Sequence, residues 1–372
     1  MSNLKVRENV LFYKRDTYLG SEQGGVKLNP DVSLIDCAVG DSQWGISPKA
    51  REAGNAFLVE NVSAYPHDLF YEELLKPAVL ARFHASGVCR NQVFFGHGSF
   101  NLAERLIHKM IEPGVMIGVG PQFNEIPSEF VAAGGSYQPL PVYPPMFDFP
   151  MRAVLTRLAR GDCSVMYLDN PNNPLGRLLE LENLELIVKT AEEFGTIVVV
   201  DEAYGDFVPD ANSAIHLVGQ FSNLAVLRSC SKGLGLAAER VGYMFLSEKM
   251  AGLYQPLDVP FEPSLYAATL ARATMEDGEF QAQLRDGVTK SKRAVTSVLM
   301  RAGFQILPTH PAVSIMTIFK HKVNVVAMMA DWGIMVEAGS CFGKTHPGWD
   351  DSYCRLRLPR DRDLEEFCRR IG

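Results

Sequence analysis

Short runs of apolar residues alternate with segments of helical periodicity through the middle of the chain. Several runs are continuous rather than alternating, as in Ile-Val-Val-Val at residues 197–200. Segments 102–111 and 181–194 carry apolar residues at helical spacing, and the second ends at Gly195. Continuous apolar strands are typical of a sheet that is covered on both faces. The pattern therefore predicts an α/β domain of three layers around a mostly parallel sheet. Its expected strands cover residues 92–95, 115–119, 164–168, 196–200, 224–227 and 241–246.

The pattern changes after Tyr254. The stretch Gln-Pro-Leu-Asp-Val-Pro-Phe-Glu-Pro-Ser contains three prolines, and longer helical patterns follow at 265–276 and 280–302. Strand-like runs return at 313–319 and 354–358. A chain of 372 residues is also long for one domain. We therefore expect a second, smaller α+β domain. The large domain is expected to span residues 45–255, and the small one to combine residues 1–44 with 256–372.

Composition narrows the class of protein. Hydrophobic residues make up 47% and charged residues 21% of the chain, as in an ordinary globular protein. A net charge of −7 argues against a basic face for nucleic acid or anionic membranes. No apolar run approaches the roughly 18 residues of a membrane-spanning helix, and the first ten residues lack the apolar core of a secretory signal. Seven cysteines without a Cys-x-x-Cys pair predict free thiols, no metal site and a cytoplasmic location.

Lys232 lies in a turn of hydroxyl residues and glycines that directly follows an expected strand. The segment reads Arg228-Ser-Cys-Ser-Lys232-Gly-Leu-Gly. A lysine in a tight polar turn at a strand end is suited to forming a covalent bond with a carbonyl group. Taken alone, such a lysine is more often an ordinary surface residue.

A carboxylate follows another expected strand. Asp201 comes directly after residues 196–200, at the strand end where open α/β sheets bind ligands. There it could pair with a protonated ring nitrogen, and Tyr204 could donate a hydrogen bond to a ring oxygen. A helix N-cap or a solvated loop residue is the alternative for Asp201.

Glycines and hydroxyl groups predict an anion site. The segment Gly96-His-Gly-Ser-Phe-Asn101 connects an expected strand to a helix, so its free N–H groups and the positive end of the helix would face an anion. Most turns of this kind bind nothing. The residues expected to contribute are Gly98, Ser99, Ser229, Ser231 and Arg240. A fourth motif, Asn170-Pro-Asn-Asn-Pro-Leu-Gly176, forms a rigid turn from which Asn173 could donate to the same ring oxygen, although turn formation alone explains it as well.

Together these motifs resemble the fold-type I pyridoxal-phosphate enzymes of the class I/II aminotransferase family. Asn173, Asp201, Lys232 and Arg240 follow one another at intervals of 28, 31 and 8 residues, in the order of the family. The resemblance runs from about residue 35 to about residue 358. It is strongest to the branch of histidinol-phosphate aminotransferases and threonine-phosphate decarboxylases, whose Tyr-Pro-Asp resembles Tyr-Pro-His at 65–67.

The resemblance implies a role for each motif. Lys232 would hold pyridoxal 5′-phosphate as a Schiff base and carry the proton between substrate and cofactor. Asp201 would bind the pyridine nitrogen, with Asn173 and Tyr204 at the phenolic oxygen. Gly98, Ser99, Ser229, Ser231 and Arg240 would bind phosphate, and Phe123 would stack on the ring. Arg355 would clamp the substrate α-carboxylate. Tyr65 would reach the phosphate in a partner subunit, which implies a homodimer.

One departure from the branch concerns the substrate. Where the phosphate-substrate branch has Val-Arg, this chain has Val336-Glu337. A carboxylate at that position disfavours histidinol phosphate and threonine phosphate, and suggests a basic amino acid as an alternative substrate. A solvent-facing Glu337 is the simpler explanation.

We therefore expect an aminotransferase that moves the α-amino group of an L-amino acid to a 2-oxo acid by a ping-pong mechanism. A pyridoxal-phosphate-dependent decarboxylase, racemase, lyase or oxidase is the main alternative, because the same scaffold supports these reactions. A non-catalytic regulator is a third possibility, disfavoured because the segment before residue 35 is short and not basic.

Overall fold

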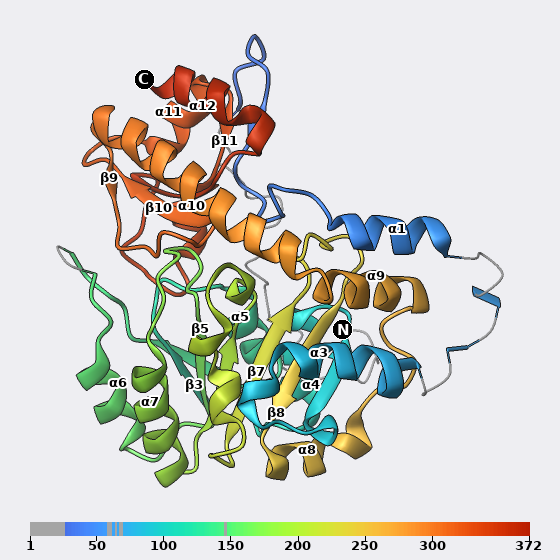
Figure 1. The fold of residues 1–372 in the computed structure, drawn as a ribbon. Helices are drawn as coiled ribbons and strands as arrows, with labels where there is room; N and C mark the ends of the chain where they lie inside the picture. Colours follow the sequence, from blue (N-terminus) through green and yellow to red (C-terminus); the bar gives the residue numbers. More distant parts are fainter. Residues whose placement is uncertain (1–26, 58–61, 64, 67–69, 145–146) are drawn as a thin grey trace, which may run out of the picture.

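A seven-stranded sheet forms the centre of the larger part of the molecule (Figure 1). The structure is a computed structural model, and it describes residues 27–57, 62–63, 65–66, 70–144 and 147–372. Within them the strand order is β2-β8-β7-β6-β5-β3-β4. Strand β8 runs antiparallel to both of its neighbours, and all other pairs are parallel. The strands are β2 (Val93–Gly96), β3 (Val115–Gly118), β4 (Ser136–Pro139), β5 (Val165–Asp169), β6 (Ile197–Asp201), β7 (Leu224–Ser229) and β8 (Gly242–Leu246).

Helices cover both faces of this sheet. Val198 and Val200 of β6 belong to the core cluster that includes α7, whereas Val199 belongs to the one that includes α4 and α5. Because side chains alternate along a strand, a strand with two apolar faces lies between two hydrophobic layers. The helices of the larger part are α1 (Pro48–Ala56), α3 (Lys76–Arg82), α4 (Ser99–Lys109), α5 (Glu125–Ala132), α6 (Met151–Leu158), α7 (Leu181–Glu193), α8 (Glu248–Tyr254) and α9 (Leu265–Met275).

The three-layer prediction is confirmed, and the differences are local. All six expected strands and the two expected helices are present. Helix α4 begins at Ser99, three residues before the expected start, because Gly98 adopts a φ of 91° and ends the preceding turn. Strand β4 was not predicted, since its sequence, Ser-Tyr-Gln-Pro, is polar and alternately exposed at the sheet edge.

The smaller part lies above the large sheet in Figure 1 and contains the C-terminus. An antiparallel sheet of order β12-β13-β10-β9 forms its centre, and the short strands β1 and β11 pair in parallel beside it. Residues 35–36 thus pair with a strand of the C-terminal region. The division into domains at residues 45 and 255 stays a prediction. The elements are β1 (Ile35–Asp36), β9 (Gln305–Ile306), β10 (Ile315–Phe319), β11 (Ile334–Met335), β12 (Glu337–Ala338), β13 (Tyr353–Arg357), α10 (Gly278–Arg301), α11 (Val325–Asp331) and α12 (Leu364–Ile371).

Two loops join the parts of the molecule. A Cβ built on Gly120, after β3, would lie only 1.7 Å from the carbonyl oxygen of Thr345 in the smaller part. The Thr345 hydroxyl oxygen accepts a hydrogen bond from the Gln122 N–H (3.2 Å) and lies 3.0 Å from Asn124 Oδ1. The loop that carries Phe123 is therefore hydrogen-bonded to the smaller part.

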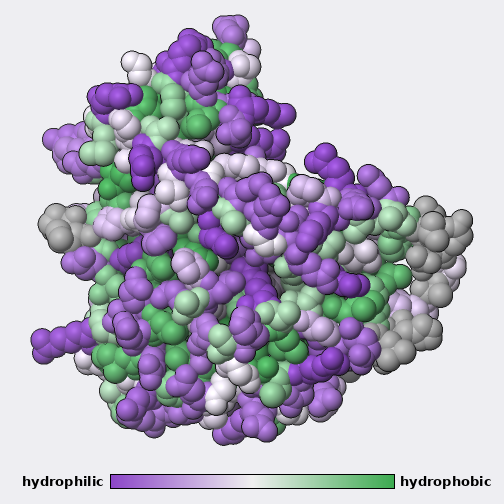
Figure 2. All heavy atoms as spheres, viewed as in Figure 1, coloured by the Kyte–Doolittle hydropathy of each residue, from purple (hydrophilic) through white to green (hydrophobic). Residues whose placement is uncertain are grey.

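Hydrophilic and hydrophobic residues are intermixed on the face of the molecule seen in Figure 2. Hydrophilic residues extend over both parts of the molecule, and hydrophobic residues appear between them in small groups. Among the helices of the described residues, none combines the length and apolar character needed to cross a membrane.

Candidate active site

A cavity of about 620 Å³ lies where β5, β6 and β7 end and α4 begins. Residues of the smaller part complete its wall, among them Arg355 of β13. Cavities at the carboxyl ends of sheet strands are the usual ligand sites of α/β folds. The sequence-predicted residues that line it are Ser99, Phe123, Asn173, Asp201, Tyr204, Ser229, Ser231, Lys232, Arg240 and Arg355.

Lys232 lines this cavity. Its Nζ lies 5.7 Å from the centre of the Tyr204 ring, and a Cβ on Gly40 would come within 3.0 Å of Nζ. Desolvation in the cavity, together with the positive charge of Arg355, lowers the pKa of Lys232 to about 8. A lysine with a pKa near 8 exists in part as the neutral, nucleophilic amine at physiological pH.

Asp201 ends β6 at one side of the cavity. Its carboxylate accepts hydrogen bonds from the Ala203 N–H (3.0 Å) and the Tyr167 hydroxyl (3.4 Å). Burial raises the pKa of Asp201 to about 6, although these hydrogen bonds and the charge of Lys232 oppose the rise. A positively charged ring nitrogen beside Asp201 would favour its ionised form.

Residues around the start of α4 and after β7 form an anion site in the cavity. Gly98 is the N-cap of α4, so the N–H groups of the first helical turn point outward beside it. The Arg240 guanidinium donates to the Ser231 hydroxyl (3.3 Å), and the Ser231 N–H donates to the Ser229 hydroxyl (3.1 Å). Arg240 itself has a φ of 56°, a left-handed conformation that costs on the order of 1–3 kcal/mol in a residue other than glycine. Such strain is typical of residues held in place for binding.

Asp169, at the end of β5, was not singled out from the sequence. One of its carboxylate oxygens accepts two backbone hydrogen bonds, from Phe123 (3.0 Å) and from Asn173 (3.0 Å). Asp169 and Asp201 also occupy paired positions on neighbouring strands. The signal that could have found it is an acidic residue directly before the Asn-Pro-Asn-Asn-Pro motif, at a strand end equivalent to that of Asp201.

Arg355 and Glu337 face each other across two antiparallel strands of the smaller part. Their side chains form an ion pair, and the Arg355 guanidinium also donates to Asn173 Oδ1 (3.0 Å). Glu337 is only 1% exposed, so the alternative of a solvent-facing side chain is wrong. Glu337 is not among the residues that line the cavity, and it contacts the lining residue Arg355 through this ion pair.

Tyr65 lies away from this cavity in the single chain. It is 81% exposed, and its ring centre lies 5.2 Å from that of Phe261. Its flanking residues Ala64 and His67 are outside the described residues, so the resemblance of that segment to the family rests on its sequence.

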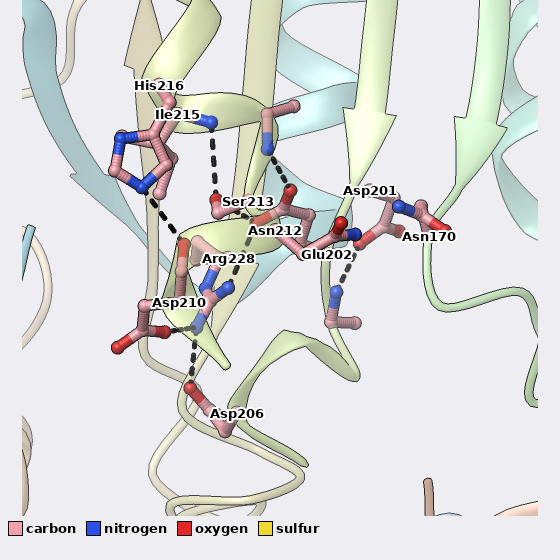
Figure 3. A network of polar contacts seen from close by, with 12 residues as sticks. Asn170, Asp201, Glu202, Asp206, Asp210, Asn212, Ser213, Ile215, His216 and Arg228 are labelled. Carbon is pink, nitrogen blue, oxygen red and sulfur yellow. Dashed lines mark hydrogen bonds and ion pairs between the residues drawn. The ribbon is translucent and has the colours of Figure 1, made fainter. Parts of the chain in front are cut away.

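Figure 3 shows a buried network of ion pairs around Arg228, four residues before Lys232 in the sequence. Arg228, the second-last residue of β7, pairs with Glu202 (2.9 Å) and Asp206 (2.9 Å). The Ser213 hydroxyl donates to Glu202 as well (2.6 Å). Sequence reasoning missed this network because its charges come from separate motifs. It ties the segment after Asp201 to the segment before Lys232.

The residues present fit a phosphorylated pyridine aldehyde. The cavity is lined by a guanidinium (Arg240), two serines (Ser229 and Ser231), a carboxylate (Asp201) and an amine (Lys232), and α4 begins beside it at Ser99. Gly98 leaves the space that its missing side chain would take from Arg240. This donor set matches phosphate, pyridine nitrogen and aldehyde in turn.

The family model for class I and II aminotransferases matches residues 35–371, and the chain belongs to this family. The protein is thus a pyridoxal-phosphate-dependent transferase of the aminotransferase type. A histidinol-phosphate aminotransferase of Brevibacillus brevis is 27% identical over 315 residues, which are 84% of each chain. Histidinol-phosphate aminotransferase 1 of Pseudomonas fluorescens is 31% identical over 290 residues, 75% of this chain and 76% of that protein.

Solved structures share the fold at lower identity. Histidinol-phosphate aminotransferase from Sinorhizobium meliloti, in complex with pyridoxal 5′-phosphate, superimposes with a TM-score of 0.80 at 19% identity, over 99% of this chain and 96% of that one. A pyridoxal-phosphate-bound C–S lyase from Staphylococcus hominis gives a TM-score of 0.81 at 14% identity, over the same shares of the two chains. The fold is therefore common to enzymes that catalyse different reactions.

Proposed function

We propose that the protein transfers the α-amino group of an L-amino acid to a 2-oxo acid in two half-reactions. A cavity lined by Lys232, Asp201, Arg240 and Arg355 supports this proposal, because each charge has a counterpart in the cofactor or in an α-amino acid. Pyridoxal 5′-phosphate, when bound, supplies an aldehyde for the amino group and a ring that withdraws electrons from the α-carbon.

Each side chain has one task in this proposal. Lys232 would hold the cofactor, and its amine would move the proton at the substrate α-carbon. Asp201 would bind the ring nitrogen, Asn173 and Tyr204 would bind the phenolic oxygen, and Phe123 would stack on the ring. The phosphate would be held by Gly98, Ser99, Ser229, Ser231 and Arg240.

Arg355 binds the substrate α-carboxylate, and Glu337 sets the charge of this clamp. Because Glu337 neutralises part of the Arg355 charge, a singly charged carboxylate is favoured over a doubly charged phosphate. We therefore propose an amino acid rather than a phosphate ester as the substrate. A direct contact between Glu337 and a basic substrate side chain gains no support, since Glu337 is not among the residues lining the cavity.

The charge of the clamp is tested with the variant Glu337→Gln. Loss of one buried negative charge should raise the affinity for histidinol phosphate relative to an α-amino acid by about tenfold, or about 1.4 kcal/mol. An unchanged ratio of the two dissociation constants would count against a role of Glu337 in selecting the substrate.

We also propose a cytoplasmic homodimer in which Tyr65 reaches the phosphate in the partner subunit. The exposed apolar residues Val62 and Phe261, near Tyr65, support a subunit contact there. All seven cysteines are free thiols, which supports the cytoplasmic location. Two inactive variants, Lys232→Ala and Tyr65→Phe, should regain part of the activity when they are mixed, because one site of the mixed dimer would be intact. A monomeric mass in sedimentation would contradict the dimer.

Spectroscopy tests the reaction. The purified protein with cofactor should be yellow, with an absorption band at the violet end of the visible spectrum. This band should disappear when an amino acid is added and return when a 2-oxo acid is added. Release of carbon dioxide, ammonia or peroxide without recovery of the band would indicate a decarboxylase, lyase or oxidase instead.

A further inference from the structure

Asp169 joins two segments that flank the cofactor cavity. The loop after β3 carries Phe123, and the turn after β5 carries Asn173; the backbone N–H groups of both residues donate to the same oxygen of Asp169, each at 3.0 Å. The other oxygen accepts from Asn172 Nδ2 (2.9 Å). All three of these contacts require Asp169 to act as an acceptor.

The surroundings fix the direction of these hydrogen bonds. Asn172 Nδ2 also donates to the Pro121 carbonyl (3.0 Å), while its Oδ1 accepts from the Leu175 N–H (3.1 Å). The amide of Asn172 cannot rotate by half a turn without losing both contacts. An asparagine at position 169 would therefore place its NH₂ group against a donor, either Asn172 or the two backbone N–H groups.

Asn173 extends this connection to the substrate side. Its Oδ1 accepts from the Arg355 guanidinium at 3.0 Å, so the turn held by Asp169 also positions a contact of Arg355. The Asp169 carboxylate faces the cavity wall between Phe123 and Asn173. An error in its hydrogen bonding would displace the two sides of the cavity relative to each other.

We propose that Asp169 is a positioning residue that sets the distance between the ring-stacking loop at Phe123 and the Asn173 turn. This inference rests on the proposed function for its effect on the cofactor, whereas its effect on the two segments is independent of any ligand. Asp169 is not assigned a catalytic step, because it acts through the backbone of Phe123 and Asn173. A geometry shift of about 1 Å in such a site is enough to lower binding or activity strongly.

The test compares Asp169→Asn with Val165→Ala, which removes buried methyl groups from the start of the same strand. Hydrogen–deuterium exchange of the cofactor-free protein should increase at residues 121–124 and 171–174 in Asp169→Asn, and at neither segment in Val165→Ala. The dissociation constant for pyridoxal 5′-phosphate should rise about 10- to 100-fold. The pH midpoint of the visible band should also shift by at least half a unit in Asp169→Asn alone.

Equal exchange, affinity and pH midpoint in the two variants would overturn the inference, since Asp169 would then contribute to stability only. If Asp169→Asn does not fold, Asp169→Ser keeps one acceptor oxygen and should give the same changes; unchanged exchange at both segments would again overturn the inference. If the visible band of the wild-type protein also appeared in the Lys232→Ala variant, the proposed function would be contradicted. The hydrogen–deuterium exchange result would still decide the role of Asp169.

Discussion

The Arg240 guanidinium lies where a side chain at position 98 would begin. A Cβ built on Gly98 falls 2.7 Å from Arg240 Nη2, inside the distance that unbonded atoms tolerate. Both residues have positive φ angles, 91° for Gly98 and 56° for Arg240, and both belong to the expected phosphate site. The anion site therefore depends on a missing side chain as much as on a charge.

Replacement of Gly98 by alanine should weaken cofactor binding. The new methyl group would displace Arg240, so the dissociation constant for pyridoxal 5′-phosphate should rise at least about tenfold. The matched control is Gly134→Ala, because Gly134 has a φ of 103° and no neighbour within 4 Å of its Cβ position. The control should lose a similar amount of stability through backbone strain and keep its affinity. Equal dissociation constants for pyridoxal 5′-phosphate in Gly98→Ala and Gly134→Ala would rule out the steric explanation.

Asp201 should make the cofactor-free protein less stable as the pH rises. The pKa of its carboxyl is raised from 3.8 to about 6 in the folded protein, so the folded state holds a proton that the unfolded state has lost between these values. The free energy of unfolding should fall from about pH 4 to about pH 6, by on the order of 1–3 kcal/mol for this group. Asp201→Asn should make the fall smaller, and the part that remains is expected from Asp169, whose pKa burial raises to about 7. Denaturation by urea across this range measures the difference; parallel curves for both proteins would contradict it.

Lys232 should react with the cofactor over an unusually low pH range. Because desolvation lowers its pKa to about 8, the fraction of neutral amine increases steeply around pH 8 rather than around pH 10.5. The rate at which the visible band forms after mixing cofactor-free protein with pyridoxal 5′-phosphate should follow this midpoint. Lys232→Ala is the control and should form no band. A midpoint near 10 would mean that the lysine is solvated.

Arg228 should contribute strongly to stability. It lies buried against Glu202 and Asp206, and its removal takes the ion-pair partner from Glu202, while Asp206 keeps its pair with Arg82 (2.8 Å). We expect Arg228→Met to lower the free energy of unfolding by about 3–5 kcal/mol. Arg272→Gln, which breaks an exposed pair with Glu276 (2.9 Å), should cost less than about 1 kcal/mol. Similar losses in the two variants would show that burial does not distinguish these pairs.

Most of the fold was predictable from the apolar runs of individual strands. The strands that end at Asp169 and Asp201 have continuous apolar runs, so their burial on both faces follows from the sequence alone. Strand β4 has no such run, because it lies at the sheet edge and exposes every second residue. The two-residue strand β12 is too short for any periodicity. Its place in the sheet depends on pairing with β13.

The site was predictable where its residues follow strands. Parallel strands bring their carboxyl ends to one edge, so Asn173, Asp201 and Lys232 meet although they are distant in the chain. The Glu337–Arg355 pair depends on the register of an antiparallel pair, which the sequence does not specify. The acceptor role of Asp169 depends on three donors that are scattered in the sequence. Tyr65 would need a second chain to reach a site.

The close packing of Gly120 against Thr345 has a kinetic consequence. The smaller part of the molecule cannot swing outward without pulling on the loop that carries Phe123, because hydrogen bonds of Thr345 hold that loop. A substrate that draws Arg355 inward would thus tighten the ring-stacking face in the same movement. Binding of the α-carboxylate and ordering of the ring-stacking loop would then occur together. A substitution that disrupts the contact between Gly120 and Thr345 should therefore change both the Michaelis constant and the cofactor spectrum.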